Sequence, residues 1–504
     1  MPSAPAIVMT GLGTQSASVD PSVGCISGDS IAVGRPHVAA SRPAGLAPPT
    51  AIALDRSSSL HWTVLALAGP ALLDQFLQTL LMLSDLKLAG SLEHSEDMLS
   101  AVGMVGQLML MVGVLFNAIG VGAMALVARS IGAGDRPQAD RVTRQAMLLG
   151  VIIGVVAAGT MMALAEPMLA ALGLTGRALD SGVMFTRVMM PGLGVGALMF
   201  MGGACLRGAG DTSGALIAAG VANIVNIAVA WTLCNGWLGV PAMGLTGIAV
   251  GTLSAYAVGG LFMLHLVRAG RRGVRARVRP IALDRDLVSR ILRIGSFAGI
   301  ESLTFAAAST VVASIVAHPP LGENDFASFM LTLRLHGLSF LPGYAFGIAG
   351  GALVGQSLGA GRLKQASRYG WISYLWGGGL MTVIGAGLVI FPDPLVRFFT
   401  RADTAPEVID QAVQMLRICG FIQPFLALLM ILPGCLKAAG DTRYPAAITF
   451  VCVLGFRLPG CYVIARFLPF GVVGVWCVMM AELVLRSIVM TWRFIHGGWK
   501  KIRV

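Results

Sequence analysis

Charged residues are scarce in this chain of 504 residues, because Asp, Glu, Lys and Arg together make up only 12% of it. Hydrophobic residues make up 56%, and the mean hydropathy is +0.79. An ordinary soluble domain carries about twice that share of charge, ~25%. The composition therefore excludes a typical soluble globular protein and favours an integral membrane protein.

Metal-binding and catalytic patterns are also lacking. The eight cysteines include no C-x-x-C pair, and most lie inside apolar runs, so we expect neither disulfides, nor a metal site, nor a cofactor. The chain has no H-E-x-x-H motif and no Walker A lysine loop. A G-x-S-x-G sequence at 355–359 follows an apolar segment rather than a strand, and its repeat counterpart at 128–132 lacks the first glycine. We therefore expect no enzymatic activity.

A long internal repeat is present instead. CLRGAGDT at 205–212 returns as CLKAAGDT at 435–442, and ARSIGAGDRPQADR at 128–141 returns as GQSLGAGRLKQASR at 355–368. GLTGIAV at 244–250 corresponds to GVVGVWC at 471–477. The spacing of 227–230 residues is far longer than a solenoid repeat of ~20–50 residues. A duplicated half in so apolar a chain is typical of transporters, in which one repeat moves against the other.

Apolar stretches long enough to cross ~30 Å of hydrocarbon recur twelve times after residue 60. The predicted spans are 61–89, 101–128, 143–166, 181–207, 213–235, 243–267, 291–317, 327–355, 368–391, 408–436, 444–466 and 471–494. The predicted fold is an all-α integral membrane protein, with twelve transmembrane helices in two pseudo-symmetric six-helix lobes around a central cavity. The predicted parts are a disordered cytoplasmic tail (1–58), an N-terminal lobe (59–267), a basic cytoplasmic linker (268–290), a C-terminal lobe (291–495) and a short basic cytoplasmic tail (496–504).

The basic residues predict the orientation of these spans. With the N-terminus inside, the inner loops hold twenty-one Arg and Lys residues and the outer loops hold four. Both termini are therefore expected on the cytoplasmic side of a bacterial-type inner membrane. The net charge of +12 is spread over many separate loops, which argues against nucleic-acid binding. The charges of the linker are expected to set topology and interact with water, and the alternative is contact with anionic lipid headgroups; membrane lipid is the expected partner of the chain.

The repeated GDT sequence predicts a tight turn between two helices. A glycine ends the first helix in left-handed geometry, and the following Asp and Thr cap the next helix. The residues concerned are Gly208, Gly210, Asp211 and Thr212 in the first half, and Gly440, Asp441 and Thr442 in the second.

Six segments together resemble the MATE family of multidrug and toxin extruders, over about residues 60–495. They are PALLDQFLQTLLMLSDLKLAG in the first span, the GAGD loop after the second, LRGAGDT after the fourth, NIVNIAV in the fifth, LVGQSLGAGR at the end of the eighth, and LKAAGDT after the tenth. The resemblance implies two six-helix lobes and export of small molecules, bulky cationic or amphipathic compounds, coupled to H⁺ or Na⁺. We expect a monomer.

The first span carries the main candidates for cation coupling. Asp74 and Asp85 are eleven residues apart, about three helical turns, so they share a face with Gln78. An ionisable residue inside the bilayer is a functional hypothesis by default. The resemblance points to Asp85, fifteen residues after Pro70. The alternative for Asp85 is a carboxylate at the helix end that contacts water or Lys87. The alternative for Asp74 is a buried, hydrogen-bonded packing residue.

In the second half Glu301 stands 227 residues after Asp74, so both are expected to face the cavity. An uncompensated Arg334 in the eighth span would be costly, which predicts a Glu301–Arg334 ion pair. The alternative is a Glu301 carboxylate that is free to bind substrate or a proton. The acid of one MATE subgroup falls at Phe305 in this chain.

Amides complete the candidate set. Asn223 and Asn226 lie three residues apart in the fifth span, and Asn117 lies in the second. The resemblance would place an Asp where this chain has Ala230, and the tenth span, near Gln423, lacks the Asp of some members. Amides with one carboxylate suit Na⁺, whereas an Asp alone can carry a proton, so both coupling ions remain open.

The sequence leaves two functions to compare. One is a cation-coupled exporter. The other is a lipid-linked-saccharide flippase of related architecture, which tends to have several basic residues in the cavity and often two extra helices. Twelve spans and few intramembrane cations favour export.

Overall fold

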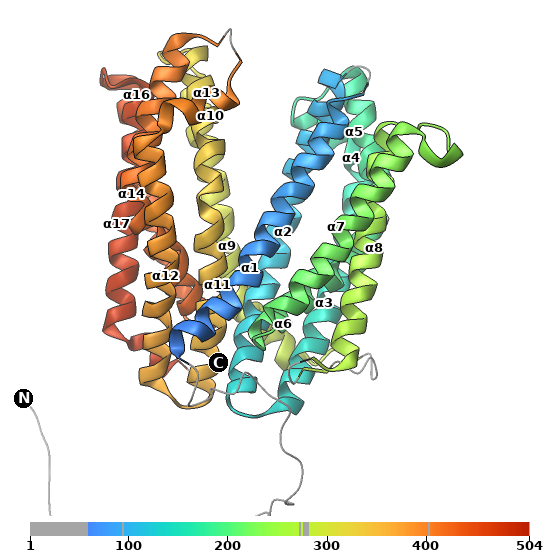
Figure 1. Ribbon diagram of the computed structural model, residues 1–504, viewed down its shortest axis with the longest axis vertical. Helices are drawn as coiled ribbons and strands as arrows, with labels where there is room; N and C mark the ends of the chain where they lie inside the picture. The colour runs from blue at the N-terminus through green and yellow to red at the C-terminus, as the bar shows by residue number, and fades with distance from the viewer. Residues whose placement is uncertain (1–58, 93–94, 272–273, 276–281, 402–403, 503–504) are drawn as a thin grey trace, which may run out of the picture. The chain divides into compact units, whose positions relative to one another are not determined.

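The computed structural model describes residues 59–92, 95–271, 274–275, 282–401 and 404–502, and these are almost entirely helical (Figure 1). The predicted tail over 1–58 lies outside them. Within the described residues, twelve helical spans are long and apolar enough to cross a membrane, which confirms the predicted number. A helix pairs its own backbone polar groups, so it is the form that such apolar segments take in lipid.

The helices fall into two sets of similar order (Figure 1). The first half contains α1 (Leu60–Ala89), α2 (Ser95–Gly132), α3 (Arg136–Ala163), α4 (Ala165–Ala171), α5 (Gly176–Met189), η1 (Met190–Gly192), α6 (Leu193–Gly208), α7 (Thr212–Asn235), η2 (Trp237–Gly239) and α8 (Leu245–Ala269). The second half contains α9 (Arg285–Ala317), α10 (Glu323–Leu338), α11 (Phe340–Gly359), α12 (Leu363–Ile390), α13 (Pro392–Phe399), α14 (Pro406–Ala438), α15 (Arg443–Cys452), η3 (Val453–Arg457), α16 (Leu458–Phe467), α17 (Gly471–His496) and η4 (Gly498–Lys501).

The span formed by α15, η3 and α16 changes its winding halfway along. Residues 453–457 of η3 form a π-helical segment between two α-helices. Pro459 follows it and has no N–H to donate to the carbonyl of Gly455, four residues earlier, so the regular α-helical ladder is interrupted at this point. Such π segments are frequent at functional sites, and this one carries Arg457.

Each half has its own hydrophobic core, but the first helix of each half is shared between the two. Leu88 and Ala89 at the end of α1 belong to the core formed by α2 to α8, whereas Leu67 near its start belongs to the core of the second half. α9 is divided in the same way, because Ile291 near its start belongs to the core of the first half and Val312 near its end belongs to the core of the second half. These two helices therefore contribute to the cores of both halves, and α2 and α11 also contact each other across the halves.

Glycines bring the two halves into close contact. A Cβ on Gly122 of α2 would clash with the Ile291 carbonyl of α9, and one on Gly359 of α11 would clash with the Arg129 carbonyl of α2. Small residues of this kind let membrane helices approach backbone to backbone.

Two side chains add hydrogen bonds at the same contact. Gln356 donates through Nε2 to the Gly208 carbonyl at 2.9 Å, and Arg129 donates through Nη2 to the Ala439 carbonyl at 2.8 Å. These contacts lie at the helix ends that precede the loops expected on the cytoplasmic side. The halves are thus closed against each other at that end.

The repeated GDT turns have the predicted backbone. Gly210 and Gly440 have φ of 84° and 85°, which is left-handed geometry. The same prediction for Gly208 was wrong, because Gly208 is the last residue of α6 and its φ is not positive. Asp211 caps α7 as predicted, because its Oδ1 accepts from the Gly214 N–H at 2.9 Å. Thr442, however, makes no capping hydrogen bond to α15, and Asp441 instead pairs with Arg493 at 2.9 Å. The capping prediction for the second turn was therefore wrong. Asp211 also forms an ion pair, with Arg271 at 2.8 Å, but its other carboxylate oxygen still caps α7.

Candidate functional site

Asp74 is a buried carboxylate with a partner. It lies in α1, and its Oδ2 is 3.6 Å from Nη1 of Arg207 near the end of α6. The sequence allowed either a coupling role or a packing role for Asp74. An ion pair that joins two helices favours a structural role, since the carboxylate is already compensated.

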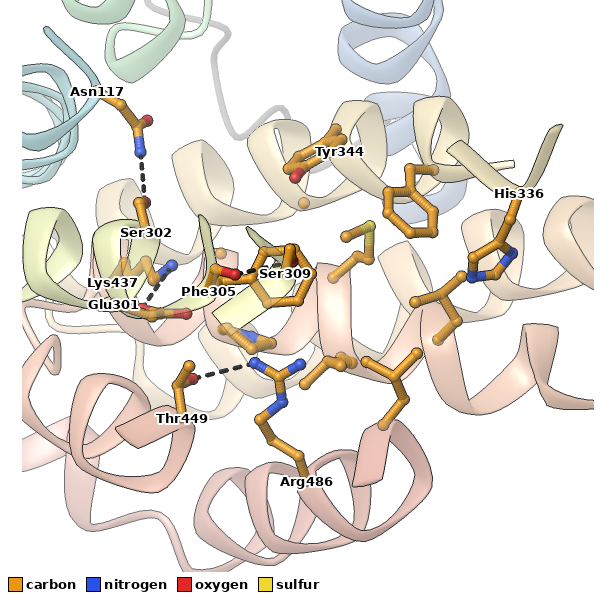
Figure 2. A pocket seen from close by; sticks show the side chains of 18 of the residues that line it. Asn117, Glu301, Ser302, Phe305, Ser309, His336, Tyr344, Lys437, Thr449 and Arg486 are labelled. Carbon is orange, nitrogen blue, oxygen red and sulfur yellow. Dashed lines mark hydrogen bonds and ion pairs between the residues drawn. The ribbon is translucent and has the colours of Figure 1, made fainter. Parts of the chain in front are cut away.

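Glu301 has the equivalent partner in the second half. Its Oε2 is 2.9 Å from Nζ of Lys437 near the end of α14 (Figure 2). The predicted Glu301–Arg334 pair was wrong, because Arg334 is exposed on α10 while Lys437 lies next to the carboxylate. The repeat itself held the missed signal, since CLRGAGDT and CLKAAGDT both carry a basic residue at the third position. The same helix-to-helix ion pair is thus built once in each half.

Asp85 is the carboxylate that lacks such a partner. It lies one turn before the end of α1, and its Oδ1 is enclosed and accepts no hydrogen bond within the described structure. Gln78, predicted on the same face, is exposed and donates to Gln75 at 3.5 Å. Asp85 therefore remains available to bind an ion or a proton.

The predicted amides contact other partners. Asn223 donates to the Leu77 carbonyl of α1 at 3.0 Å, and the fully buried Asn226 donates to Thr252 Oγ1 of α8 at 3.3 Å. Asn226 Oδ1 accepts no hydrogen bond from the described residues. Neither amide is hydrogen-bonded to Asp85 in the part of the chain that the structure describes. The two donated hydrogen bonds thus fix α7 against its neighbours.

Asn117 lies where the two halves meet. Its Nδ2 donates to Ser302 Oγ of α9 at 3.4 Å, and both side chains line a cavity of about 390 Å³ (Figure 2). The cavity lies mostly in the second half. Its lining includes Glu301, Ser302, Phe305, Ser309, His336, Phe340, Tyr344, Lys437, Thr449, Arg457, Trp476, Met479, Met480, Leu483 and Arg486. It falls in the size range of small-molecule pockets, roughly 300–1,000 Å³.

A buried ionic cluster adjoins this cavity. Glu482 of α17 is fully buried, and its carboxylate lies 2.6 Å from Nη2 of Arg457 and 2.9 Å from Nε of Arg486. Arg486 also donates to Thr449 Oγ1 at 3.3 Å (Figure 2). This cluster was not predicted from the sequence. Its signal was a charged i, i+4 pair, Glu482 and Arg486, in the middle of an apolar span.

Aromatic rings surround these cations. The Phe305 ring lies with its centroid 5.1 Å from Cζ of Arg457 and 5.7 Å from Cζ of Arg486. His336 is 2% exposed and packs edge-on against Trp476, with ring centroids 6.0 Å apart. Neither ring nitrogen of His336 is hydrogen-bonded to a described residue. Polar groups that could bind a ligand are therefore present in an otherwise apolar cavity.

Within the described residues there is no group of three or more His, Cys, Asp or Glu side chains that could hold a metal ion. The arrangement is suited to binding small molecules and single ions.

Comparisons with known proteins agree with this architecture. The MatE family model matches residues 70–232 and 298–463, one match in each half. A probable multidrug resistance protein NorM of Thermotoga maritima is 28% identical over 87% of this chain and 93% of its own length. The multidrug resistance protein PmpM of Pseudomonas aeruginosa is 24% identical over 87% of this chain and 92% of its own length.

A solved structure shows the same fold. It is described as the outward-facing conformation of a multidrug resistance MATE family transporter of the MOP superfamily, and it superposes with a TM-score of 0.80 at 22% identity, over 88% of this chain and 98% of its own. The family match covers well over half of the sequence and both copies of the repeat. The chain therefore belongs to the MatE family and is a multi-pass membrane transporter.

Proposed function

We propose that the protein is a secondary active antiporter that exports amphipathic small molecules in exchange for H⁺ or Na⁺ by alternating access. The duplicated halves, and the close contacts between them at one end, support a mechanism in which the halves move against each other. The names of the relatives, NorM and PmpM, support multidrug compounds as the broad substrate class.

Asp85 is the proposed coupling residue, and one contrast carries this assignment. Asp74, Glu301 and Glu482 each have a cation within 4 Å, whereas no ion pair to Asp85 is found in the described structure. A carboxylate without a compensating cation is costly in an apolar span unless it takes up a proton or a metal ion. Ion uptake at Asp85 would thus change the stability of the first lobe and could be coupled to opening of the halves.

A transport assay tests this proposal. Ethidium and norfloxacin accumulation would be measured in a pump-deficient host, with and without Na⁺ and with and without a protonophore. The wild type should lower accumulation, and Asp85→Asn should abolish that effect at equal membrane expression. Glu96→Gln, which removes an exposed carboxylate at the start of α2, is the matched control and should export normally. Normal export by a well-expressed Asp85→Asn protein would remove Asp85 from the mechanism.

The orientation in the membrane is part of the proposal. We place both termini on the cytoplasmic side of a bacterial inner membrane, with the loops at 90–100, 318–326 and 392–407 outside, because the basic residues gather on the other side. Membrane-impermeant thiol reagents should label single cysteines in those three loops of intact cells. Strong labelling of a cysteine placed at 270–285 would contradict this orientation.

One observation supports the flippase as a second candidate. Three basic side chains, those of Lys437, Arg457 and Arg486, line the cavity, more than the sequence predicted. A lipid-linked pyrophosphate is an anion that such a cavity could attract. The twelve spans within the described residues still favour export, because flippases of this kind often have two more.

A further inference from the structure

The ionic cluster of the second half, consisting of Arg457, Glu482 and Arg486, carries more positive than negative charge. Two guanidinium groups share one carboxylate, at 2.6 Å and 2.9 Å, and all three side chains are buried. Guanidinium groups stay protonated in proteins, so the cluster keeps an excess of one positive charge in an apolar environment. A buried excess charge of this kind is stabilised when an anion binds beside it.

The spare hydrogen-bonding capacity of the cluster adjoins the cavity. Arg457 and Arg486 both line the cavity, whereas Glu482 is not among the lining residues. Nε and Nη1 of Arg457 are enclosed and donate to no described residue. The two ring nitrogens of His336, on another wall of the same cavity, are also without partners among the described residues. Unpartnered donors of Arg457 thus border the cavity, whereas the Glu482 carboxylate that neutralises part of the charge does not.

Among the described lining residues, no other acid compensates this charge from inside the cavity. The Glu301 carboxylate is 2.9 Å from Lys437, so that pair adds no net charge. The position that lies over both guanidinium groups is occupied by Phe305, a neutral ring that contacts them with its face. The lining as a whole, with Lys437, Arg457, Arg486 and Glu301, is therefore cationic.

The rest of the cavity is apolar and aromatic. Phe340, Trp476, Met479, Met480 and Leu483 form much of its wall, and its volume is about 390 Å³. Aromatic rings and methionines suit a flat hydrophobic ligand body. A ligand that matches this cavity combines such a body with one anionic group.

We propose that this cavity binds amphipathic aromatic acids, with Arg457 and Arg486 contacting the carboxylate or sulfonate of the ligand. The inference rests on the proposed transport function and narrows its substrate class. The resemblance to the MATE family implied cationic or amphipathic substrates, and the charge of the cavity selects acidic amphipathic compounds among them.

Equilibrium dialysis with the purified full-length protein in detergent tests the assignment. The probes are nalidixate, an aromatic carboxylate, its ethyl ester, which lacks the charge, and ethidium, an aromatic cation. Nalidixate should bind at least tenfold more tightly than the ester or ethidium. Arg457→Gln removes the excess charge but leaves the Glu482–Arg486 pair, so it should keep the fold and weaken nalidixate binding by roughly tenfold or more.

Two further variants make the result specific. Arg334→Gln removes the same charge from an exposed position on α10 and should leave nalidixate binding unchanged. Phe305→Glu places a carboxylate between the two guanidinium groups and should abolish nalidixate binding, whereas Phe305→Leu should retain most of it. If Arg457→Gln does not fold, as judged by size-exclusion chromatography, the two Phe305 variants decide the question.

The opposite results would overturn the proposal. These are equal binding of nalidixate and its ester, tighter binding of ethidium, or unchanged nalidixate binding in both Arg457→Gln and Phe305→Glu. Farnesyl pyrophosphate serves as a lipid probe, and if it displaces nalidixate with a much higher affinity, the anion is a lipid headgroup and the small-molecule assignment is wrong. Arg457-dependent binding without ion-driven efflux in cells would contradict the antiport function and leave the binding site intact.

Discussion

The last long helix of each half, α8 in the first and α17 in the second, occupies the same place in the repeat. Both begin at or beside a glycine with positive φ, Gly244 and Gly471, and both are followed by one, Gly270 and Gly497. The spacing of 227 residues is the same at the two ends. The backbone of the repeat is therefore shared, and the two helices can be compared position by position.

The side chains at matched positions differ in charge. Glu482 and Arg486 of α17 correspond to Ala255 and Gly259 of α8. Gly259 allows close packing, since a Cβ there would lie 2.8 Å from Cβ of Ala222 in α7. The first half is thus tightly packed where the second half holds an ionic cluster beside a cavity.

The carboxylates of the first span show the opposite asymmetry. Asp85 in α1 corresponds to Val312 in α9, which is fully buried in the core of the second half. Asp74 and Glu301, by contrast, correspond to each other and have corresponding basic partners. The repeated ion pair belongs to the common architecture, whereas Asp85 and the arginine cluster are specific to one half each. This difference suggests that the first lobe couples to the ion and the second binds the substrate.

Removing the acid of the cluster should have the largest effect. Glu482→Gln leaves two buried guanidinium groups without a carboxylate and should lower stability by about 3–5 kcal/mol, seen as a large loss of folded protein. Fluorescence-detected size-exclusion chromatography after heating measures this. The triple variant Arg457→Met, Glu482→Leu, Arg486→Met should recover folding, because no buried charge remains. A stable Glu482→Gln protein would show that the cluster is not closed to water.

A methyl group in the packed half should have the next largest effect. Gly259→Ala forces α7 and α8 apart against Ala222 and Met199, at an expected cost of about 1–3 kcal/mol. Gly159→Ala in α3 is the control, since a Cβ there would have no atom within 4 Å, and it should change the melting temperature little. Equal melting temperatures for the two variants would contradict the tight packing assigned to the first half.

The repeated ion pair permits a direct comparison of the halves. Glu301→Gln should cost about 1–2 kcal/mol, between the values for exposed and fully buried pairs, because Glu301 and Lys437 are partly accessible. Asp74→Asn should cost less, since its ion pair is longer, 3.6 Å against 2.9 Å. Double-mutant cycles with Arg207→Gln and Lys437→Gln would measure both couplings. A larger coupling energy for Asp74 would reverse the ranking.

The smallest effect is expected at Arg334. Its side chain is exposed, so Arg334→Gln should change stability by less than about 0.5 kcal/mol and should leave transport intact. Thermal unfolding and norfloxacin accumulation measure the two expectations. A strong defect would restore Arg334 as a functional residue of the second half.

Much of the fold could be predicted from sequence because lipid imposes strong rules. Twelve apolar segments must be helices, and the matching GDT turns predicted the left-handed glycines Gly210 and Gly440. The cap by Asp211 follows from local sequence, but the ion pairs of Asp211 with Arg271 and of Asp441 with Arg493 join residues 60 and 52 positions apart. Such long-range pairings are not encoded in local patterns.

The site was predicted less completely for the same reason. The Asp85 assignment, which stays a prediction, needed only one helix and the family pattern. Pairing Glu301 required knowledge of which cation lies beside it, and the nearest candidate in an apolar run, Arg334, was on the wrong face. Arg457 reaches the cavity from a span whose regular α-helix gives way to a π segment, and a heptad or 3.6-residue periodicity does not describe that register.

The central claim is that the first lobe couples to the ion and the second lobe binds the substrate. Two measurements on the Asp85→Asn protein test it most directly. These are its affinity for nalidixate and its transport rate in proteoliposomes. Asp85→Asn should bind nalidixate with the wild-type affinity, because the arginine cluster lies in the other lobe, and should lose ion-driven transport. Loss of binding together with transport, or retention of both, would contradict this separation.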